Sequence, residues 1–384
     1  WIERTKFLED KLSDRLHEEL TKSFIDKRAS VLARGLKQDI KFDTQIINEE
    51  KVMINNEYIG SLKGLKLDLD LKIGALDTDV KSLKKAARQN VGPEILKRIE
   101  QIINTGIIEL KEDFKIYWKK FPIAKIYPGK DYLNPKVEVI IDEMIENLDK
   151  KRLQSYLTNW IEKTIFENLE SLINLKFIKE NNPDVRALAY HVYENNGVVK
   201  REEVIKLLSK LDQSQRKILR TQGLRFGRYH IFLYKLFKPN SVKLRILLWK
   251  NFHQKFYKLS PPTFGLNFVE KTKNVDRKFM LLCGFEYFEK YYVRIDILER
   301  LFIKIIDSVD KNTNEIKLVP EMLNLLGCSK ENFLYLIKKM NYKTFEKDNN
   351  TYFKYAPKKI NRKVKVKNKD NDNPFNVLNQ LNLK

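Results

Sequence analysis

PEMLNLLGCSKENFLYLIKKMNYKTFEKDNNTYFKY, residues 320–355, is the stretch of this chain whose sequence predicts a complete small fold. Its first part has helical spacing and ends at Gly327, and Ser329 is positioned to cap a second helix over residues 330–340. Two segments rich in β-forming residues then flank the polar turn KDNN. Helix, tight turn, helix and hairpin in this order predict a C-terminal winged-helix-like segment over residues 311–357.

The second of these helices has two different sides. Helical spacing places Phe333, Leu334, Ile337 and Met340 on its apolar side. The basic side chains then face outward, and the candidate nucleic-acid contacts of this segment are Lys330, Lys338, Lys339 and Lys343. In DNA-binding proteins of this shape the second helix enters the major groove and the hairpin contacts the backbone. Winged helices also dock proteins, so both nucleic-acid contact and protein docking are open for this segment.

The rest of the chain predicts a multi-domain protein that is mainly α with small β-hairpin modules. A hairpin is expected around Asn55-Asn56, and Gly92-Pro93 predicts a break in a helix over residues 79–104. No internal repeat is visible in the residues. Together with the winged-helix-like segment, the expected divisions are helices over 1–40, a mixed α/β module with two β-rich stretches over 41–141, a helical accessory domain over 142–310, and a basic tail over 358–384.

The charge of the chain is strongly positive and unevenly distributed. The formal net charge is +23 and the isoelectric point is near 9.6. Residues 213–269 contain no Asp or Glu but hold twelve Lys and Arg and eleven aromatic residues. Cations interleaved with flat rings suit a polyanion with bases that stack, so RNA or DNA is the leading partner. The alternative is a helical core whose cations pair with acidic residues elsewhere in the chain.

Within this acid-free run, Arg225-Phe226-Gly227-Arg228 is the most informative motif. Gly227 falls early in a run that predicts helix, where a residue without a side chain permits close approach of another backbone or a phosphate. Tight helix packing is the simpler interpretation of the glycine, and the two arginines are better phosphate ligands. The further candidate contacts are Arg225, Arg228, Lys238 and the tail residues Lys358, Lys359, Arg362, Lys363, Lys365 and Lys367, in a tail expected to be disordered.

The motifs of common enzyme classes are absent from the sequence. There is no phosphate-binding G-x-x-x-x-G-K-[ST] loop, no H-E-x-x-H and no nucleophile elbow, and the four histidines lack metal-ligand spacing. Asp142-Glu143 and Glu146 resemble a paired-carboxylate site, but at i, i+1 and i+4 of an expected helix such residues more often form a solvated face. Cys283 and Cys328 cannot build a disulfide framework and are expected to be buried thiols in a reducing cytoplasm. No membrane partner, catalytic residue, metal or cofactor is expected for this segment.

A set of short motifs runs along the chain, the most distinctive being LRFGR at 224–228 followed by LFKP at 236–239. The others are TKF at 5–7, HEELTKSFIDKR at 17–28, LR at 244–245, LW at 248–249, CGF at 283–285, VRID at 293–296, LERL at 298–301, LLGCS at 325–329, and NPF at 373–375 with Leu378. Together they resemble the C-terminal region of a group of alphaproteobacterial superfamily 2 ATP-dependent helicases. That group is similar to the mitochondrial degradosome RNA helicase.

The resemblance implies a longer parent protein whose preceding part contains two RecA-like motor domains that bind ATP and Mg and hydrolyse ATP. None of the motor motifs is present here, so ATP hydrolysis cannot be assigned to any residue of this chain. The chain begins with Trp rather than Met, which also predicts a fragment, with residues 1–40 as connecting helices. The expected function is that of a nucleic-acid-binding accessory region of a helicase. The alternatives are a scaffold that docks a protein such as a nuclease, and a winged-helix DNA-binding regulator.

Overall fold

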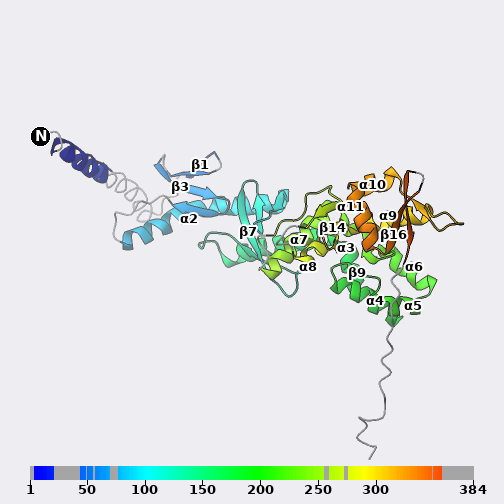
Figure 1. Ribbon diagram of the computed structural model, residues 1–384. Coiled ribbons are helices and arrows are strands. Elements are labelled where there is room, and N and C mark those ends of the chain that lie inside the picture. Colours follow the sequence, from blue (N-terminus) through cyan, green and yellow to red (C-terminus); the bar gives the residue numbers. More distant parts are fainter. Residues whose placement is uncertain are drawn as a thin grey trace, which may run out of the picture. The chain divides into compact units, whose positions relative to one another are not determined.

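The computed structural model describes residues 4–20, 44–48, 50–54, 57–69, 77–254, 259–271, 276–347 and 349–356. Within these ranges the chain is a mixture of helices and five small antiparallel sheets of three or four strands (Figure 1). It divides into two compact units. The first comprises the described residues up to Gly265 and those of the segment ending at Glu286, and the second comprises Leu266–Lys271 and the described residues from Tyr287 onward.

The N-terminal part of the first unit contains a helix at residues 4–20 and a four-stranded sheet. The strands pair in chain order, β1 (Thr44–Ile47), β2 (Lys51–Ile54), β3 (Glu57–Lys63) and β4 (Lys66–Leu69). Because β2 pairs with β3, the hairpin expected there is confirmed. The rest of the expected 1–40 helical segment lies outside the described residues.

The break expected at Gly92-Pro93 is wrong, because α2 (Asp77–Thr105) continues through Pro93. Proline in a helix removes one backbone hydrogen bond and crowds the preceding turn. Here the helix remains continuous because its apolar side is buried in the core. The buried residues on that side are Val91, Ile95, Ile99 and Ile102. Burial of an amphipathic face contributes more to helix stability than local propensity does.

The second four-stranded sheet confirms the other β-rich stretch and also pairs in chain order. Its strands are β5 (Ile108–Leu110), β6 (Lys115–Trp118), β7 (Phe121–Tyr127) and β8 (Lys136–Val139). One face is apolar, with Ile116, Ala124, Ile126 and Val137 buried in the core of the unit. The long helix α3 (Asn147–Lys176) packs against β8 and adds Leu153 to this core.

Residues 142–310 are not purely helical, so that expectation requires correction. After α4 (Pro183–Glu194) come β9 (Val198–Lys200), α5 (Ile205–Lys210), α6 (Gln213–Thr221), β10 (Leu224–Phe226) and β11 (His230–Leu233). The three strands form one sheet in the order β10-β11-β9. The sheet was missed because β11 is buried at all four positions and therefore shows no alternation of apolar and polar residues. We call residues 183–233 the first module.

Two further modules follow with a similar order of elements, although in its described residues the second has one helix between the first strand and the hairpin where the others have two. After the 3-10 turn η1 (Tyr234–Phe237), the second contains α7 (Pro239–His253), β12 (Phe268–Glu270), α8 (Arg277–Leu282), β13 (Phe285–Phe288) and β14 (Tyr291–Arg294), and its residues are divided between the two compact units. The third contains α9 (Ile295–Asp307), β15 (Ile316–Lys317), α10 (Pro320–Leu326), α11 (Lys330–Lys339), β16 (Tyr342–Lys347) and β17 (Asn350–Tyr355). In each module the first strand pairs with the last strand of the hairpin: β9 with β11, β12 with β14, and β15 with β17.

The elements expected for the C-terminal segment are confirmed one by one. Gly327 ends α10 in the left-handed conformation, and the Ser329 side chain accepts a hydrogen bond from the backbone N–H of Asn332. Strands β16 and β17 form the expected hairpin. The apolar side of α11 differs in one residue, because Leu336 is fully buried whereas Leu334 is only partly buried.

The three modules share one junction between helix and hairpin. Gly223, Gly284 and Asn341 each stand two residues after a helix and directly before a strand, with φ of 91°, 91° and 65°. Each donates its backbone N–H to the carbonyl three residues earlier, at 2.9, 2.9 and 3.2 Å. The structure therefore repeats an arrangement of elements that the residues themselves do not reveal.

Candidate nucleic-acid interface

The first module presents arginines stacked on aromatic rings beside its hairpin. The guanidinium of Arg220, at the end of α6, lies 5.4 Å from the centre of the Phe226 ring. The guanidinium of Arg225, on the edge strand β10, lies 4.8 Å from the centre of the Tyr234 ring. Both arginines are exposed, as is Lys217 on α6. Stacking orients a guanidinium without neutralising it, so its N–H groups can contact phosphate.

The turn of the same hairpin carries Arg228, and a second arginine holds the turn in place. Gly227 lies in this turn rather than in a helix, so the helical interpretation of the motif is wrong. The backbone N–H of Gly227 donates to the carbonyl of His230 at 2.8 Å. Arg201 donates its backbone N–H to Tyr229 and its side chain to the Gly227 carbonyl, each at 2.8 Å. Arg228 is thereby presented on a tied, exposed turn.

A buried carboxylate beside this turn, Glu286, contacts a histidine, a lysine and an arginine. Glu286 lies 2.9 Å from His230 Nε2, 3.1 Å from Lys200 Nζ and 3.2 Å from Arg277 Nη2. Burial alone would raise the pKa of Glu286, but the hydrogen bond with His230 and the nearby positive charges lower it to about 2. Glu286 is therefore ionised at neutral pH and holds these cations near the hairpin.

The cations of the acid-free run have different roles, and only some of them are placed to contact a bound nucleic acid. Lys235 pairs with Glu170 at 3.5 Å, as the helical-core alternative expects. Arg216 donates to the carbonyl of Leu208 at 2.7 Å and so joins α6 to α5. Lys238 is exposed directly before α7. Neither the phosphate hypothesis nor the core hypothesis accounts for the whole run, because its cations contact rings, carbonyls and a carboxylate.

Arg245 is the clearest structural cation of the run. It is fully buried, and its two terminal nitrogens donate to the carbonyls of Asn196, Leu236 and Leu282 at 2.8, 3.5 and 2.7 Å. Burial lowers the pKa of this guanidinium. The side chain joins the turn after α4 to η1 and to the end of α8. It cannot reach a ligand, so the LR motif in which it stands is explained by packing.

In the third module, two of the predicted contacts have acidic partners. Lys339 lies 2.6 Å from Glu289 at the β13–β14 turn, and Tyr335 donates its hydroxyl to the same carboxylate at 2.9 Å. The hydrogen bond from Lys339 lowers the pKa of Glu289. Lys330 lies 3.9 Å from Glu346. These three α11 side chains therefore contact the chain's own residues.

The other two predicted contacts of the third module, Lys338 and Lys343, are exposed. Lys338 is exposed on α11, and Lys343 is exposed on β16 directly opposite Lys354. The predicted tail contacts lie outside the described residues: Lys358, Lys359, Arg362, Lys363, Lys365 and Lys367. The structure thus brings Arg225 and Arg228 together on one hairpin and places the α11 lysines in a different compact unit.

Sequence reasoning missed five cations near the first hairpin: Lys200, Arg201, Lys217, Arg220 and Arg277. Lys200 and Arg201 stand directly before two glutamates, so the local charge gave no signal. Arg220 could have been found, since its helix has a capping box at Asp212 and holds three basic and no acidic residues over Gln213–Thr221.

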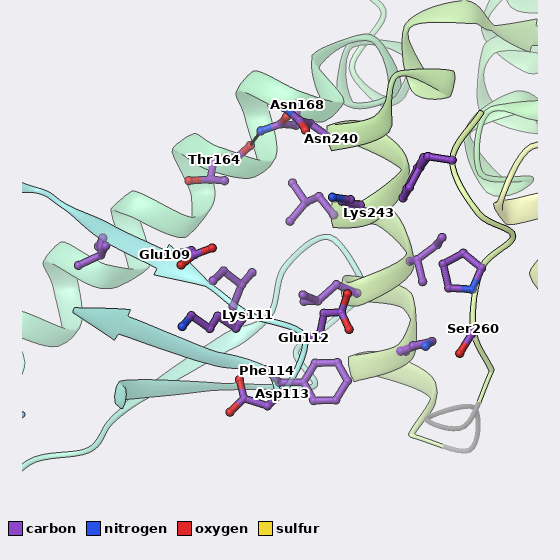
Figure 2. Close-up of a pocket in the computed structure, with 18 of the residues that line it drawn as sticks. Glu109, Lys111, Glu112, Asp113, Phe114, Thr164, Asn168, Asn240, Lys243 and Ser260 are labelled. Carbon is purple, nitrogen blue, oxygen red and sulfur yellow. Dashed lines mark hydrogen bonds between the residues drawn. The ribbon is translucent and has the colours of Figure 1, made fainter. Parts of the chain in front are cut away.

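The first unit also contains a cleft of about 950 Å³ between β5, α3 and α7 (Figure 2). Figure 2 shows Lys243 on α7 and Glu109 on β5, with Glu112 and Asp113 in the turn that follows β5. The charges of its lining are mixed, so the cleft does not suit a polyanion. Sequence reasoning gave no indication of it.

Groups suited to metal binding do not cluster in the described ranges. No set of three His, Cys, Asp or Glu residues there could hold a metal ion. The solvated helical face expected for Asp142, Glu143 and Glu146 is wrong, because they precede α3 and Asp142 is buried. Asp142 and Glu143 both approach Arg88, at 3.1 and 3.6 Å. Burial raises the pKa of the Cys283 thiol to about 12, which disfavours the reactive thiolate. None of the helices in the described ranges is long and apolar enough to span a bilayer.

Comparisons with known proteins give no further assignment. No family model, no curated protein and no solved structure matches this chain.

Proposed function

We propose that this chain is a nucleic-acid-binding accessory region of an ATP-dependent RNA or DNA helicase. The observation that carries the binding proposal is the pair of ring-stacked arginines, Arg220 and Arg225, beside the turn that presents Arg228. The helicase part rests on the sequence resemblance. ATP and Mg would be bound by motor domains of a longer parent protein and by no residue of this chain.

Contacts of this kind suit a motor. A helicase must hold its strand between steps without fixing a register, and phosphate contacts provide affinity that does not depend on sequence. The order of elements in the first and third modules, and the strand order shared by all three, support interpreting them as winged-helix-like, with the hairpin directed at the nucleic-acid backbone. In the first module the cations over rings are arginines, whose planar set of N–H donors suits phosphate.

The test is a salt titration of the triple variant Arg220→Gln, Arg225→Gln and Arg228→Gln. Binding of a fluorescent single-stranded RNA or DNA is measured by anisotropy over a range of salt concentrations. If each arginine neutralises one phosphate, the slope of log affinity against log salt should flatten by about 2, at about 0.7 per contact. All sequences should be weakened alike, because phosphates carry no sequence information.

The matched control is the triple variant Lys63→Gln, Lys97→Gln and Lys163→Gln, which removes the same charge from exposed sites with acidic neighbours. Its slope should change by much less. Equal flattening in both triple variants would mean that only net charge matters and would overturn the assignment of the site. An unchanged slope in the arginine variant would do the same.

A protein partner, such as a nuclease of a degradation assembly, is the second candidate. The helix at residues 4–20 favours it, because Leu8, Leu12 and Leu16 form an exposed apolar row at spacings of four residues. Capture of the purified partner that survives nuclease treatment would support docking, and loss on treatment would support nucleic acid. A sequence-specific regulator is disfavoured, since Lys339 and Tyr335 of α11 contact Glu289 instead of facing a groove.

A further inference from the structure

The four-stranded sheet β5–β8 has a buried face and an outer face of unusual composition. In β6, Ile116 and Trp118 are buried while Lys115 and Tyr117 are not. In β7 the same alternation leaves Lys125 and Tyr127 on the outer face. Strand β8 adds Lys136 directly opposite Tyr127. Rings and cations therefore alternate over one side of an antiparallel sheet.

Each outer tyrosine has a lysine over its ring. Lys111 Nζ lies 4.4 Å from the centre of the Tyr117 ring, and Lys125 Nζ lies 5.0 Å from the centre of the Tyr127 ring. The Tyr117 hydroxyl also donates to Asp113 at 2.8 Å, which fixes the ring on the sheet. These contacts place a positive charge over each ring, so a base that stacks on the ring takes the place of the lysine, which is then free to contact a phosphate.

The outer face also holds one facing pair of like charges, which suits an anionic partner. Lys115 and Lys125 stand directly opposite each other in the register of β6 and β7. Like charges at such positions destabilise a sheet, and an anion lying between them would remove the repulsion. Asp113, 3.4 Å from Lys115, Glu138, opposite Lys125, and Glu109, opposite Tyr117, offset most of this charge. Lys111 and Lys136 leave the face with one cation in excess.

We propose that the outer face of β5–β8 is a platform for single-stranded nucleic acid, on which bases stack on Tyr117 and Tyr127 while lysines contact the phosphates. Tyr117 pairs with Pro122, and Tyr127 lies five residues further along β7. At about 3.3 Å per residue the two rings are about 17 Å apart along the strand. Stacking on these half-buried rings requires unpaired bases, so a duplex, whose bases are already stacked, should bind this face less well.

This inference shares its partner class with the proposed function but rests on separate residues. The proposed hairpin site uses Arg220, Arg225 and Arg228, none of which belongs to this sheet. The two surfaces can therefore fail independently, and the variants below distinguish them.

The test uses the full chain with the double variant Tyr117→Ala and Tyr127→Ala. The probes are a fluorescein-labelled oligouridylate, an oligothymidylate and a blunt duplex of equal length, each followed by anisotropy. Affinity for the single strands should fall by about tenfold or more for each ring, as for other base–aromatic stacks. Duplex affinity should change by less than about twofold. Tyr127→Phe should bind as the unchanged protein does, because phenylalanine also offers a flat ring.

The matched control is Tyr190→Ala, which removes an exposed tyrosine from α4, outside the sheet. A variant with Lys115→Gln and Lys125→Gln should flatten the salt slope for single strands by about 1.4. Amide hydrogen exchange in β6 and β7 confirms that the sheet stays folded. Unchanged single-strand affinity of the folded double variant, including the case in which the face docks a protein instead, would overturn the proposal. So would equal losses for single strands and duplex.

Discussion

The shared junction of the three modules makes a quantitative prediction at Gly284. Its φ of 91° lies in the left-handed region, where an L-residue other than Asn or Asp costs about 1–2 kcal/mol. A Cβ added there would lie 2.6 and 2.8 Å from Cε1 and Cδ1 of Phe237, so the ring would have to move. Overpacking of this kind costs about 1–3 kcal/mol more. Gly284→Ala should therefore destabilise the fold by about 2–5 kcal/mol.

Gly223 is the matched control for Gly284. The two glycines have the same φ, but a Cβ added at Gly223 would meet no close neighbour. Its φ is also 91°, but an added Cβ would have its nearest neighbours at 3.7 Å from Ser171 and 3.8 Å from Tyr234. Gly223→Ala should cost only the backbone contribution, about 1–2 kcal/mol. Gly223→Asn should cost less than Gly223→Ala, because asparagine enters this conformation more readily and Asn341 already does so in the third module.

The assay is urea unfolding followed by tryptophan fluorescence, with amide hydrogen exchange to localise the effect. Trp249 reports on the second module, because its ring lies 6.0 Å from that of Phe279 in α8. Exchange in peptides covering α6 and β10 reports on Gly223. Equal costs for alanine at Gly223 and Gly284 would refute the clash argument. If Gly223→Asn were as costly as Gly223→Ala, the idea of one junction repeated three times would fail.

Two further predictions concern buried charges. The fall in the pKa of Glu286 from its ordinary 4.5 to about 2 corresponds to about 3 kcal/mol of folding free energy, fully present above pH 4.5 and lost as the pH falls through about 2. Glu286→Gln should lower the free energy of unfolding by about that amount at pH 7, as measured by urea unfolding. The difference between the variant and the unchanged protein should be smaller at pH 4. A difference that grows on acidification would contradict the prediction. Arg245→Met should cost about 3 kcal/mol or more, since it leaves the carbonyls of Asn196, Leu236 and Leu282 without their donor, and should leave the salt slope of the folded protein unchanged. An altered slope without lost stability would make Arg245 a binding residue.

The third module was predictable from the sequence because its signals are local. Gly327 ends one helix, Ser329 caps the next, and β16 and β17 are each long enough to show β-forming composition. The first module gave weaker signals from the same order of elements. Strand β10 has three residues and β11 is buried throughout, so short-range periodicity cannot separate it from helix.

The candidate site was predictable only where a motif concentrates charge in a few residues. Arg225 and Arg228 were found in this way, and the structure places both on one hairpin. Lys339 was also chosen for its local charge, but its partner Glu289 is fifty residues away in sequence. Lys200 and Arg277 were missed because their local sequence gives no signal, and only the fold brings them to Glu286.

The shared junction also indicates which cation of the third module corresponds to Arg220. Arg220 stands three residues before the left-handed Gly223, and the residue three before Asn341 is Lys338. Both side chains are exposed near the end of the helix that precedes the hairpin. Lys339 stands one position further along, where the side chain reaches Glu289. If the modules bind nucleic acid in a similar way, Lys338 is the α11 cation that the geometry favours, and Lys339 serves to join α11 to the neighbouring hairpin.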